Sequence, residues 1–260
     1  MGEENIKNIN AVIIDEDEAE LPEAKKVNEP VSVVVPIASW DKEWKKLLPD
    51  LDKLPEGTEI IFSVSEKDSS FDELPDLVSN LKGKRVKWIR SVSGRANCLN
   101  AGADVASSKF IWFLHADSRF TKDAYDSLKK SIKKYPEGLH YFNLRFLSDG
   151  PNLMLINEIG VRFRSKLLRT PFGDQGFCIK KELFDKIGGF PNNTEYGEDH
   201  LFVWHAKQAG VKIYCTGETI LTSSRKYKKN GWFNITMRHQ KMWLSQAFPE
   251  WKKLMKGVSL

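Results

Sequence analysis

Apolar and polar positions follow two different spacings along the middle of this chain. Runs of β-branched residues such as Val31-Ser-Val-Val-Val35 are typical of strands buried in a parallel sheet, and they alternate with stretches of helical spacing. Strands are predicted at 31–35, 59–64, 85–90 and 110–114, and helices at 44–51 and about 95–106. Pro36 is expected to end the first strand. Strands alternating with helices favour βαβ units, a mostly parallel sheet and the α/β class.

The second half of the chain has a more mixed pattern. Helices are predicted at 121–134, 153–168, 181–187 and 198–209, strands at 139–146 and 211–215, and a loop followed by a strand at 171–180. From Trp232 onward the pattern is helical. A break is expected at Pro249, because proline lacks the N–H that a helix interior requires.

Charge is distributed unevenly. Residues 1–30 carry nine acidic side chains against three lysines, so their net charge is −6, and because the whole chain is +5 the remainder is +11. We expect 1–30 to be a poorly ordered acidic segment, 31–227 to be one domain and 228–260 to be amphipathic helices. The basic remainder favours anionic ligands such as nucleotide diphosphates, nucleic acid or a phospholipid surface, although a solvated lysine-rich surface has the same composition.

Several classes of protein lack support in this sequence. The three cysteines are far apart and form no C-x-x-C, so neither a disulfide framework nor a zinc site is indicated. No signal peptide is apparent, and the longest apolar runs, about five residues, fall short of the ~20 that span a bilayer. A reducing, cytoplasmic location is expected. The absence of G-x-S-x-G, P-loop and G-x-G-x-x-G motifs removes three large enzyme classes.

Asp117 is the most informative single residue. It lies three residues beyond a buried apolar strand, where ligands bind in open α/β sheets, and a carboxylate there can hold a divalent cation on a diphosphate. Asp117 could instead cap the following helix.

Further upstream, Gly94-Arg95 opens a helix whose small residues favour close packing on the sheet. Arg95 could reach a phosphate or a base, or lie on the surface.

Two segments in the second half combine glycines with acidic or amide side chains. In the loop Pro171–Gly176, Gly173 and Gly176 bracket Asp174 and Gln175, which could contact sugar hydroxyls or belong to a plain turn. Glu198-Asp199 begins a helix, where acidic residues are favoured by the helix dipole, but one of the two could also act as a general base. A third segment, Ser223–Lys229, is a basic patch that suits an anion or solvent.

These segments occur in a specific order. They are Val31–Pro36, Gly94-Arg-Ala with Asn100-Ala-Gly, Phe113-Leu-His-Ala-Asp117, Pro171–Gly176, Gly188-Gly-Phe-Pro191, Glu198-Asp199 and Ser223–Tyr227. In this order the chain resembles the family 2 glycosyltransferases of the GT-A fold, and most closely a bacterial subgroup found beside radical-SAM and selenium-related genes. The resemblance runs from about Val31 to Tyr227.

The resemblance implies a GT-A sheet with flanking helices and roles for particular residues. It implies an Asp-x-Asp-like motif for Mg²⁺ or Mn²⁺ in which Asp117 and His115 are the ligands, and Asp199 or Glu198 as the catalytic base. Substrate-binding positions implied in the same way are Pro36, Glu66, Gly94, Arg95, Ala116, Gly173, Asp174, Gln175, Arg225 and Tyr227. Two departures from the family pattern affect the nucleotide base: Ile37–Glu43 replaces an Asn-Glu pair, and Val64-Ser65-Glu66 replaces an Asp, for which Glu66 or Asp68 could substitute.

The predicted function is inverting transfer of a sugar from a nucleotide-diphosphate donor to an acceptor hydroxyl. Repulsion from Glu198 is expected to raise the pKa of Asp199 and so favour its action as a base. The alternative is a catalytically inactive GT-A-fold binding protein that has lost normal nucleotide recognition. Nucleic-acid binding rests on charge alone and is not predicted.

The C-terminal segment adds a prediction about location. Its aromatic residues are interleaved with lysines and arginines, a mixture that suits helices lying in a membrane interface near a lipid-linked acceptor. Peripheral contact with the inner face of the membrane is therefore expected, although the same aromatic residues could pack onto the domain.

Overall fold

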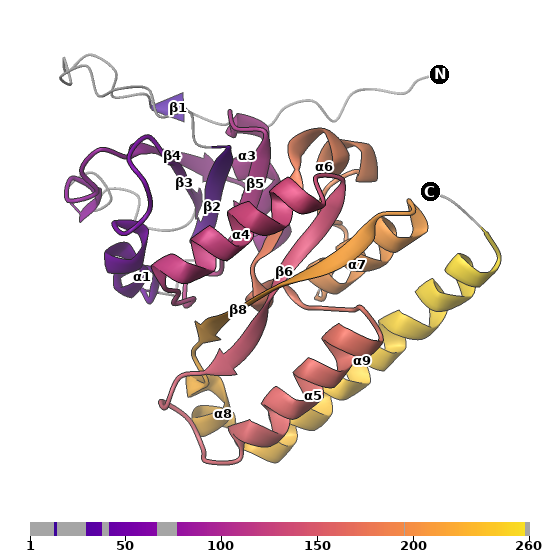
Figure 1. Cartoon of the computed structure of the whole chain (residues 1–260). Coiled ribbons are helices and arrows are strands. Elements are labelled where there is room, and N and C mark those ends of the chain that lie inside the picture. Colours follow the sequence, from indigo (N-terminus) through magenta and orange to yellow (C-terminus); the bar gives the residue numbers. More distant parts are fainter. Residues whose placement is uncertain (1–12, 15–29, 38–41, 67–76, 195, 258–260) are drawn as a thin grey trace.

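Eight strands form one sheet in the order β1-β4-β3-β2-β5-β7-β6-β8 (Figure 1). The computed structural model describes residues 13–14, 30–37, 42–66, 77–194 and 196–257. The strands are β1 (Ile13–Ile14), β2 (Val31–Ile37), β3 (Glu59–Ser65), β4 (Arg85–Ser91), β5 (Phe110–Phe113), β6 (Gly138–Phe146), β7 (Phe177–Lys180) and β8 (Lys212–Thr222). β2, β3, β4 and β5 pair in parallel, as do β6 and β8, whereas β1 and β7 are antiparallel to their neighbours. The predicted mostly parallel α/β sheet is confirmed.

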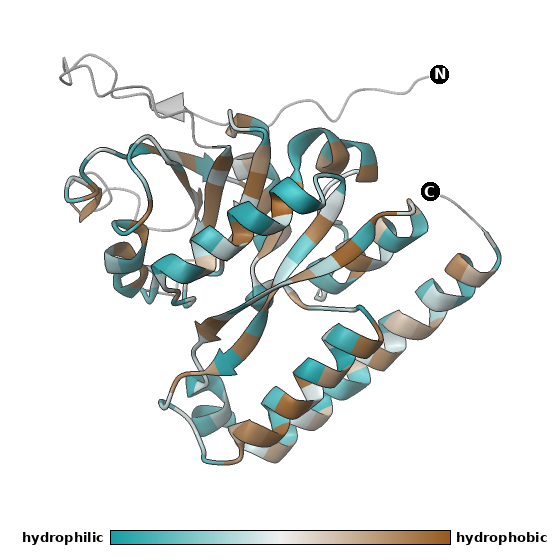
Figure 2. Ribbon diagram, in the orientation of Figure 1, coloured by the Kyte–Doolittle hydropathy of each residue, from teal (hydrophilic) through white to brown (hydrophobic). Residues whose placement is uncertain are grey.

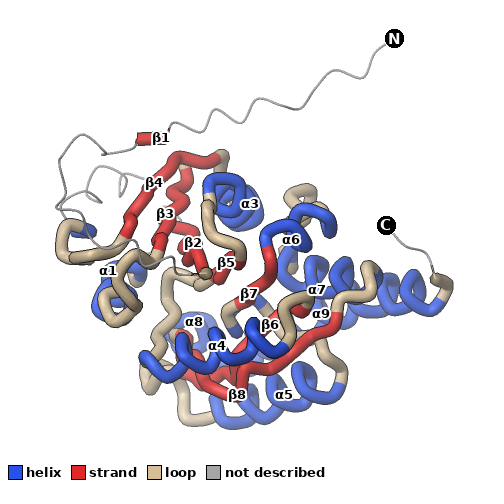
Figure 3. The backbone as a smooth tube through the Cα atoms, turned by 45° about the horizontal axis from the view of Figure 1, so that its top comes forward, coloured by secondary structure: helices blue, strands red, loops and turns tan. Residues whose placement is uncertain are grey.

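Helices cover both faces of this sheet (Figures 1 and 3). They are α1 (Trp44–Leu51), α3 (Arg95–Val105), α4 (Lys122–Lys134), α5 (Met154–Leu167), α6 (Lys181–Ile187), α7 (Glu198–Gln208), α8 (Arg225–Asn230) and α9 (Trp232–Met255), with a short turn η1 (Gly173–Gln175) before β7. α8 was not predicted and α9 was expected to break at Pro249, but the other α-helices lie within a few residues of their predicted ranges, because each has the helical spacing that the sequence shows.

Successive side chains of the central strands are buried on opposite faces of the sheet, so the core consists of two layers. In β2, Val33 and Val35 pack with Trp112 and the α1 residue Trp44 on one face. Val34, between them, packs on the other face among residues of α3, α6 and α7. Because successive side chains of a strand point to opposite faces, a fully apolar strand is one that is covered on both sides. Figure 2 shows these central strands as largely hydrophobic.

Pro36 does not end the first strand, since β2 continues to Ile37. The neighbouring strand β5 pairs with β2 only as far as Val34, whose carbonyl accepts the Leu114 N–H at 3.0 Å. The backbone groups of residues 34 and 36 point toward the same neighbouring strand, β5. Because β5 no longer pairs with β2 at residue 36, an N–H at that position would have no partner in β5. The N–H that proline lacks is therefore not needed at this position.

Two further predictions about local structure are wrong in extent. β8 continues to Thr222, well past residue 215, because it pairs with most of β6. α9 continues through Pro249 without a break. Contacts on both sides of the proline hold it: Gln246 Oε1 accepts a hydrogen bond from His200 Nδ1 at 3.2 Å, and Gln208 donates to the Glu250 carboxylate at 2.8 Å. Packing against α7 therefore overrides the local preference.

α5 and α9 lie side by side beneath the sheet (Figures 1 and 3). The Asn157 amide joins them, accepting the Trp232 indole N–H at 2.6 Å and donating to Thr236 at 3.2 Å. Within the described residues, no helix combines the length and apolar character required to cross a membrane. The predicted acidic segment 1–30 lies outside the described residues, except for Ile13–Ile14 and Pro30.

Candidate functional site

The structure brings three distant segments to one point. His115 follows β5, Gly173 lies in η1, and Asp199 is in the first turn of α7. A Cβ atom on Gly173 would lie 2.8 Å from His115 Nε2 and 3.0 Å from Asp199 Oδ2. Only glycine therefore leaves room for both side chains, which explains the glycine at this position of the loop.

Asp199 is held in its ionised form. Its Oδ2 accepts the Gly173 N–H at 2.7 Å and its Oδ1 accepts the His200 N–H at 2.8 Å. Burial opposes ionisation, but the Arg95 guanidinium and the Gly173 hydrogen bond outweigh it and lower the pKa of Asp199. The expectation that Glu198 raises this pKa is wrong, because Arg95 neutralises the neighbouring charge.

Arg95 reaches the site from the start of α3. Its Nε donates to Glu198 Oε1, and its Nη2 lies 3.9 Å from Asp199 Oδ1. Although burial favours the neutral form, the two carboxylates raise the pKa of Arg95 above its usual range. The side chain therefore orients the acidic pair and is not simply a surface arginine.

His115 and Asp117, the two predicted metal ligands, contact different neighbours. Burial lowers the pKa of His115 to about 3, so its imidazole is neutral and has a lone pair available. Asp117 accepts a hydrogen bond from Thr222 Oγ1, at the end of β8, at 3.4 Å. Ala116 between them is buried. Among the described residues, no three His, Cys, Asp or Glu side chains form a ready-made metal site.

The donor set nevertheless fits Mg²⁺ or Mn²⁺ bound together with a ligand. Such ions are commonly held by one or two carboxylates, several waters and substrate phosphates, not by an all-protein cage. Asp117 supplies a carboxylate in the turn after a parallel strand, and His115 supplies a neutral nitrogen two residues away.

Asp174 and Arg164 each carry a buried polar atom without a partner. Within the described part of the chain, neither Asp174 Oδ1 nor Arg164 Nη2 makes a hydrogen bond. Burial raises the pKa of Asp174 and lowers the pKa of Arg164 to about 10, in each case favouring the neutral form. Buried polar atoms are normally paired, so these two indicate a place where a polar ligand completes the hydrogen bonding.

Gln175, by contrast, has a structural role. Its Oε1 accepts from Ser165 Oγ at 2.7 Å and from the Phe172 N–H at 3.1 Å, and its Nε2 donates to the Phe142 carbonyl at 2.9 Å. The side chain is buried. The prediction that Gln175 contacts substrate directly is therefore wrong: its hydrogen bonds hold the shape of the loop that presents Gly173 and Asp174.

Two side chains of the basic patch 223–229, the predicted Tyr227 and its neighbour Lys226, interact with residues of the site. Arg225 pairs with Glu43 at 2.8 Å. Tyr227 packs against Met154 and Ile235, and burial and Asp174 raise its pKa to about 12. The charge of Lys226, between them, acts on both His115 and Asp174.

Three of the predicted substrate-binding residues lie near the carboxyl ends of the parallel strands β2, β3 and β4. Glu66 follows β3 and donates its N–H to the Ser91 carbonyl at the end of β4 at 2.8 Å. Gly94 begins α3 with φ 124°, a conformation that favours glycine. Pro36 lies near the carboxyl end of β2. Asp68 and residues 38–41 lie outside the described residues.

Sequence reasoning missed Arg164, His200 and Lys226. Arg164 stacks on the Phe172 ring at 3.4 Å and donates from Nε to the Thr170 carbonyl at 3.0 Å. Nothing in the spacing of α5 distinguishes it from the exposed arginines of the same helix, since its burial depends on the loop that follows. His200 adjoins the predicted Glu198-Asp199 pair and could have been found there.

Comparison with known proteins agrees with this geometry. The sequence model of glycosyl transferase family 2 matches residues 52–190, which is more than half of the 260 residues. No curated protein matches. In the solved structures, S. aureus TarS 1–349 in complex with UDP-GlcNAc is similar with a TM-score of 0.59 and 17% identity, over 76% of this chain and 59% of that one. The complex of TarS 1–349 with UDP is similar with a TM-score of 0.57 and 16% identity, over 75% of this chain and 60% of that one.

A further crystal structure of S. aureus TarS, with a longer chain, is similar with a TM-score of 0.55 and 15% identity, over 75% of this chain and 37% of that chain. This chain thus spans less than two thirds of the length of these structures. At such identities the likeness establishes the fold, which is the GT-A-like fold predicted from the sequence. The family model, the fold and the converging site segments lead to one conclusion: the chain belongs to glycosyl transferase family 2.

Proposed function

We propose that this chain transfers a sugar from a nucleotide-diphosphate donor to an acceptor hydroxyl by a single inverting displacement. The observation that supports it best is that an ionised, oriented Asp199 occurs in the same site as two buried atoms, Asp174 Oδ1 and Arg164 Nη2, that make no hydrogen bond among the described residues. An enzyme needs both a base and unfilled hydrogen-bonding positions for its substrate. We further propose residues 31–227 as the catalytic domain and 228–260 as an appended amphipathic segment.

Asp199 is the proposed base. Its lowered pKa keeps it ionised at neutral pH, ready to accept the proton of the acceptor hydroxyl as that oxygen attacks the anomeric carbon. Two backbone N–H groups fix its orientation, and Glu198 acts by holding Arg95 beside it. The Asp174 carboxyl is proposed to bind a sugar hydroxyl, which would satisfy its orphaned oxygen.

The donor diphosphate is proposed to lie near Asp117, Lys226 and Arg164. Asp117 and His115 would hold Mg²⁺ or Mn²⁺, which when bound neutralises negative charge on the departing diphosphate. Arg164 and Lys226 add positive charge, and a guanidinium suits phosphate oxygens. Glu66, Gly94 and Pro36 are proposed to border the nucleotide base. That the TarS structures carry UDP-GlcNAc and UDP supports a nucleotide-sugar donor. The inactive alternative gains no support, since a protein without turnover has no need of an oriented base.

The acceptor is proposed to be lipid-linked, with α9 in peripheral contact with a membrane. The aromatic residues Phe233, Phe248 and Trp251 are exposed on α9, and Phe248 and Trp251 also line a pocket together with residues of α7. Lysines lie among them, as in helices that bind at a membrane interface.

A screen of nucleotide sugars tests the proposal. Release of nucleoside diphosphate would be measured with Mg²⁺, with Mn²⁺ and with chelator, for the wild-type chain and for Asp117→Ala. We expect metal-dependent release with at least one donor, and its loss in Asp117→Ala with the fold intact by circular dichroism. If no donor is hydrolysed and none raises the thermal unfolding midpoint, the proposal is wrong.

A further inference from the structure

Exposed large apolar residues are concentrated on two helices. Of the 15 such residues in the described chain, 13 lie on α5 and α9 or directly beside α5. They are Leu153, Leu155, Ile156, Ile159, Phe163, Leu167 and Leu168, and Phe233, Met237, Leu244, Phe248, Trp251 and Met255. Because α5 and α9 lie side by side (Figure 1), we call the surface to which these exposed residues contribute the α5–α9 face. Monomers rarely expose so large an apolar patch without a partner.

The α5–α9 face is also strongly basic. Residues 154–169 and 225–256, which include α5, α8 and α9, contain 13 lysines and arginines against the two acids Glu158 and Glu250. Three of these bases, Arg164, Arg225 and Lys226, interact with the candidate site or with Glu43, and ten remain. Both acids are already engaged, Glu158 by the Phe146 N–H at 2.8 Å and Glu250 by Lys253 at 2.7 Å. Two copies of such a face would repel each other. An anionic lipid surface complements both its charge and its apolar side chains.

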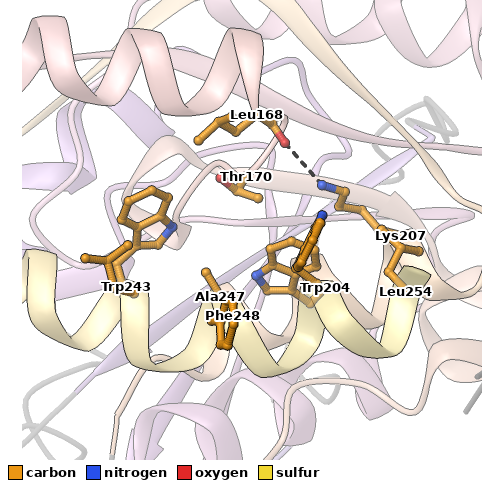
Figure 4. Close-up of a pocket in the computed structure, with 10 residues that line it drawn as sticks. Leu168, Thr170, Trp204, Lys207, Trp243, Ala247, Phe248 and Leu254 are labelled. Carbon is orange, nitrogen blue, oxygen red and sulfur yellow. Dashed lines mark hydrogen bonds between the residues drawn. The ribbon is translucent and has the colours of Figure 1, made fainter. Parts of the chain in front are cut away.

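A pocket of about 430 Å³ opens within this face, between α7, α9 and the end of α5 (Figure 4). Its lining is mainly apolar and aromatic: Leu168, Thr170, Trp204, Lys207, Trp243, Leu244, Ala247, Phe248, Trp251 and Leu254. Four of these residues, Leu168, Leu244, Phe248 and Trp251, are also exposed members of the α5–α9 face. The pocket is therefore continuous with the face and large enough for a small-molecule ligand.

The few polar groups of the pocket suit the polar part of an amphiphile. Thr170 Oγ1 and Trp243 Nε1 are buried and, within the described residues, make no hydrogen bond. Lys207 lies 4.4 Å from the Trp204 ring centre and donates to the Leu168 carbonyl at 3.1 Å. A cation with two unsatisfied polar groups in an apolar pocket favours an anionic head group attached to a hydrocarbon chain.

The pocket wall is connected to the candidate active site through α7. Trp204 follows Asp199 by five residues, about 7.5 Å along a helix axis, and its indole N–H donates to His200 Nε2 at 2.8 Å. On the other wall, Thr170 precedes Gly173 by three residues in the loop that carries Asp174. A ligand in the pocket thus lies against the same segments that position the proposed base.

We propose that this pocket binds the hydrocarbon chain of an anionic lipid presented by a bilayer at the α5–α9 face. That this lipid is the sugar acceptor rests on the proposed function, whereas lipid binding itself does not.

Titration with dodecyl phosphate, followed by calorimetry, tests the pocket. We expect Ala247→Trp, which fills the pocket, to weaken binding by about tenfold or more, since buried methylene groups lose their contacts. Ser245→Trp adds the same side chain to α9 outside both the pocket and the α5–α9 face, and should bind as the wild type does. Lys207→Gln should weaken binding of dodecyl phosphate but not of uncharged dodecyl maltoside. Unaltered binding by Ala247→Trp, or no binding by the wild type, would overturn the proposal.

Vesicles distinguish a bilayer from a free amphiphile. The wild-type chain should co-sediment with vesicles containing phosphatidylglycerol, less with phosphatidylcholine alone, and Ala247→Trp should co-sediment less than Ser245→Trp. Failure to bind either kind of vesicle would overturn the claim that a bilayer presents the lipid to the pocket. Thermal unfolding checks that both variants fold. If dodecyl phosphate binds normally but no nucleotide sugar is hydrolysed or stabilises the chain, the proposed function fails and the lipid site stands.

Discussion

Two clusters of buried charge in this protein differ in how completely their polar atoms are paired. Glu59, at the start of β3, accepts hydrogen bonds from Ser32 Oγ, from Ser107 N–H and Oγ at 2.8 Å each, and lies 3.4 Å from Lys87 Nζ. In the candidate site, Asp199 is well held, but the neighbouring Asp174 Oδ1 and Arg164 Nη2 have no partner among the described residues. Both clusters are buried, yet only one is complete.

The difference separates a structural charge from a functional one. A carboxylate that links β2, β3 and the end of α3 gains stability from every hydrogen bond it makes. An unpaired buried group lowers stability and persists where a ligand completes it. The pKa values reflect the same contrast: against the effect of burial, hydrogen bonds lower that of Glu59, whereas burial raises that of Asp174.

The largest effect is expected at the base. Asp199→Asn keeps the shape of the side chain but cannot accept the proton, so transfer should fall by about 10²–10⁴-fold. The matched control is Asp126→Asn, a half-exposed carboxylate on α4 that lies 3.9 Å from Lys129. It should retain full activity. Near-normal transfer by Asp199→Asn, measured as initial rates, would show that another group is the base.

The next effect concerns the structural cluster. Glu59→Gln replaces an acceptor with an amide whose N–H₂ meets other donors, and should lower the free energy of unfolding by about 1–3 kcal/mol near neutral pH. Because the folded pKa of Glu59 is lowered, its contribution is present above the unfolded pKa and is lost as the pH falls through the folded value. Urea unfolding at several pH values should show the difference from wild type shrinking in acid. A deficit that stayed constant would contradict this.

The smallest effect should have the opposite sign. Asp174→Asn removes a carboxylate that burial disfavours and whose Oδ1 makes no hydrogen bond among the described residues, so it should stabilise the chain, by about 0.5–2 kcal/mol, while reducing transfer. A raised folded pKa means that wild-type stability falls as the pH rises above the unfolded pKa. The gain from Asp174→Asn should therefore grow from acid toward neutral pH. Destabilisation at neutral pH would instead assign Asp174 a structural role.

Much of the fold follows from local pattern. β2, β3 and β5 are largely apolar on both faces, which predicted a covered parallel sheet, and the helical spacing located every α-helix except α8 to within a few residues. The misjudged positions depend on distant neighbours. Pro36 remains in β2 because β5 ends opposite Val34, and Pro249 remains in α9 because α7 holds both sides of it.

The candidate site was predictable only in part. Asp117, Gly173 and Glu198-Asp199 were identified by their positions after strands, in a glycine loop and at a helix start. Whether a side chain there is free or engaged is decided by tertiary contacts, so Gln175 and Asp174 could not be told apart in sequence. Arg164 was not predicted as a site residue, because its burial depends on tertiary contacts with Phe172 and Thr170.

A crystal soaked with Mn²⁺ and the nucleotide sugar selected by the hydrolysis screen tests the central claim most directly. The account predicts anomalous density for Mn²⁺ at Asp117, with the diphosphate beside it and the sugar between Asp174 and Asp199. Density for the nucleotide at any other part of the surface, with the side chains of Asp174 and Arg164 still unpaired, would contradict it.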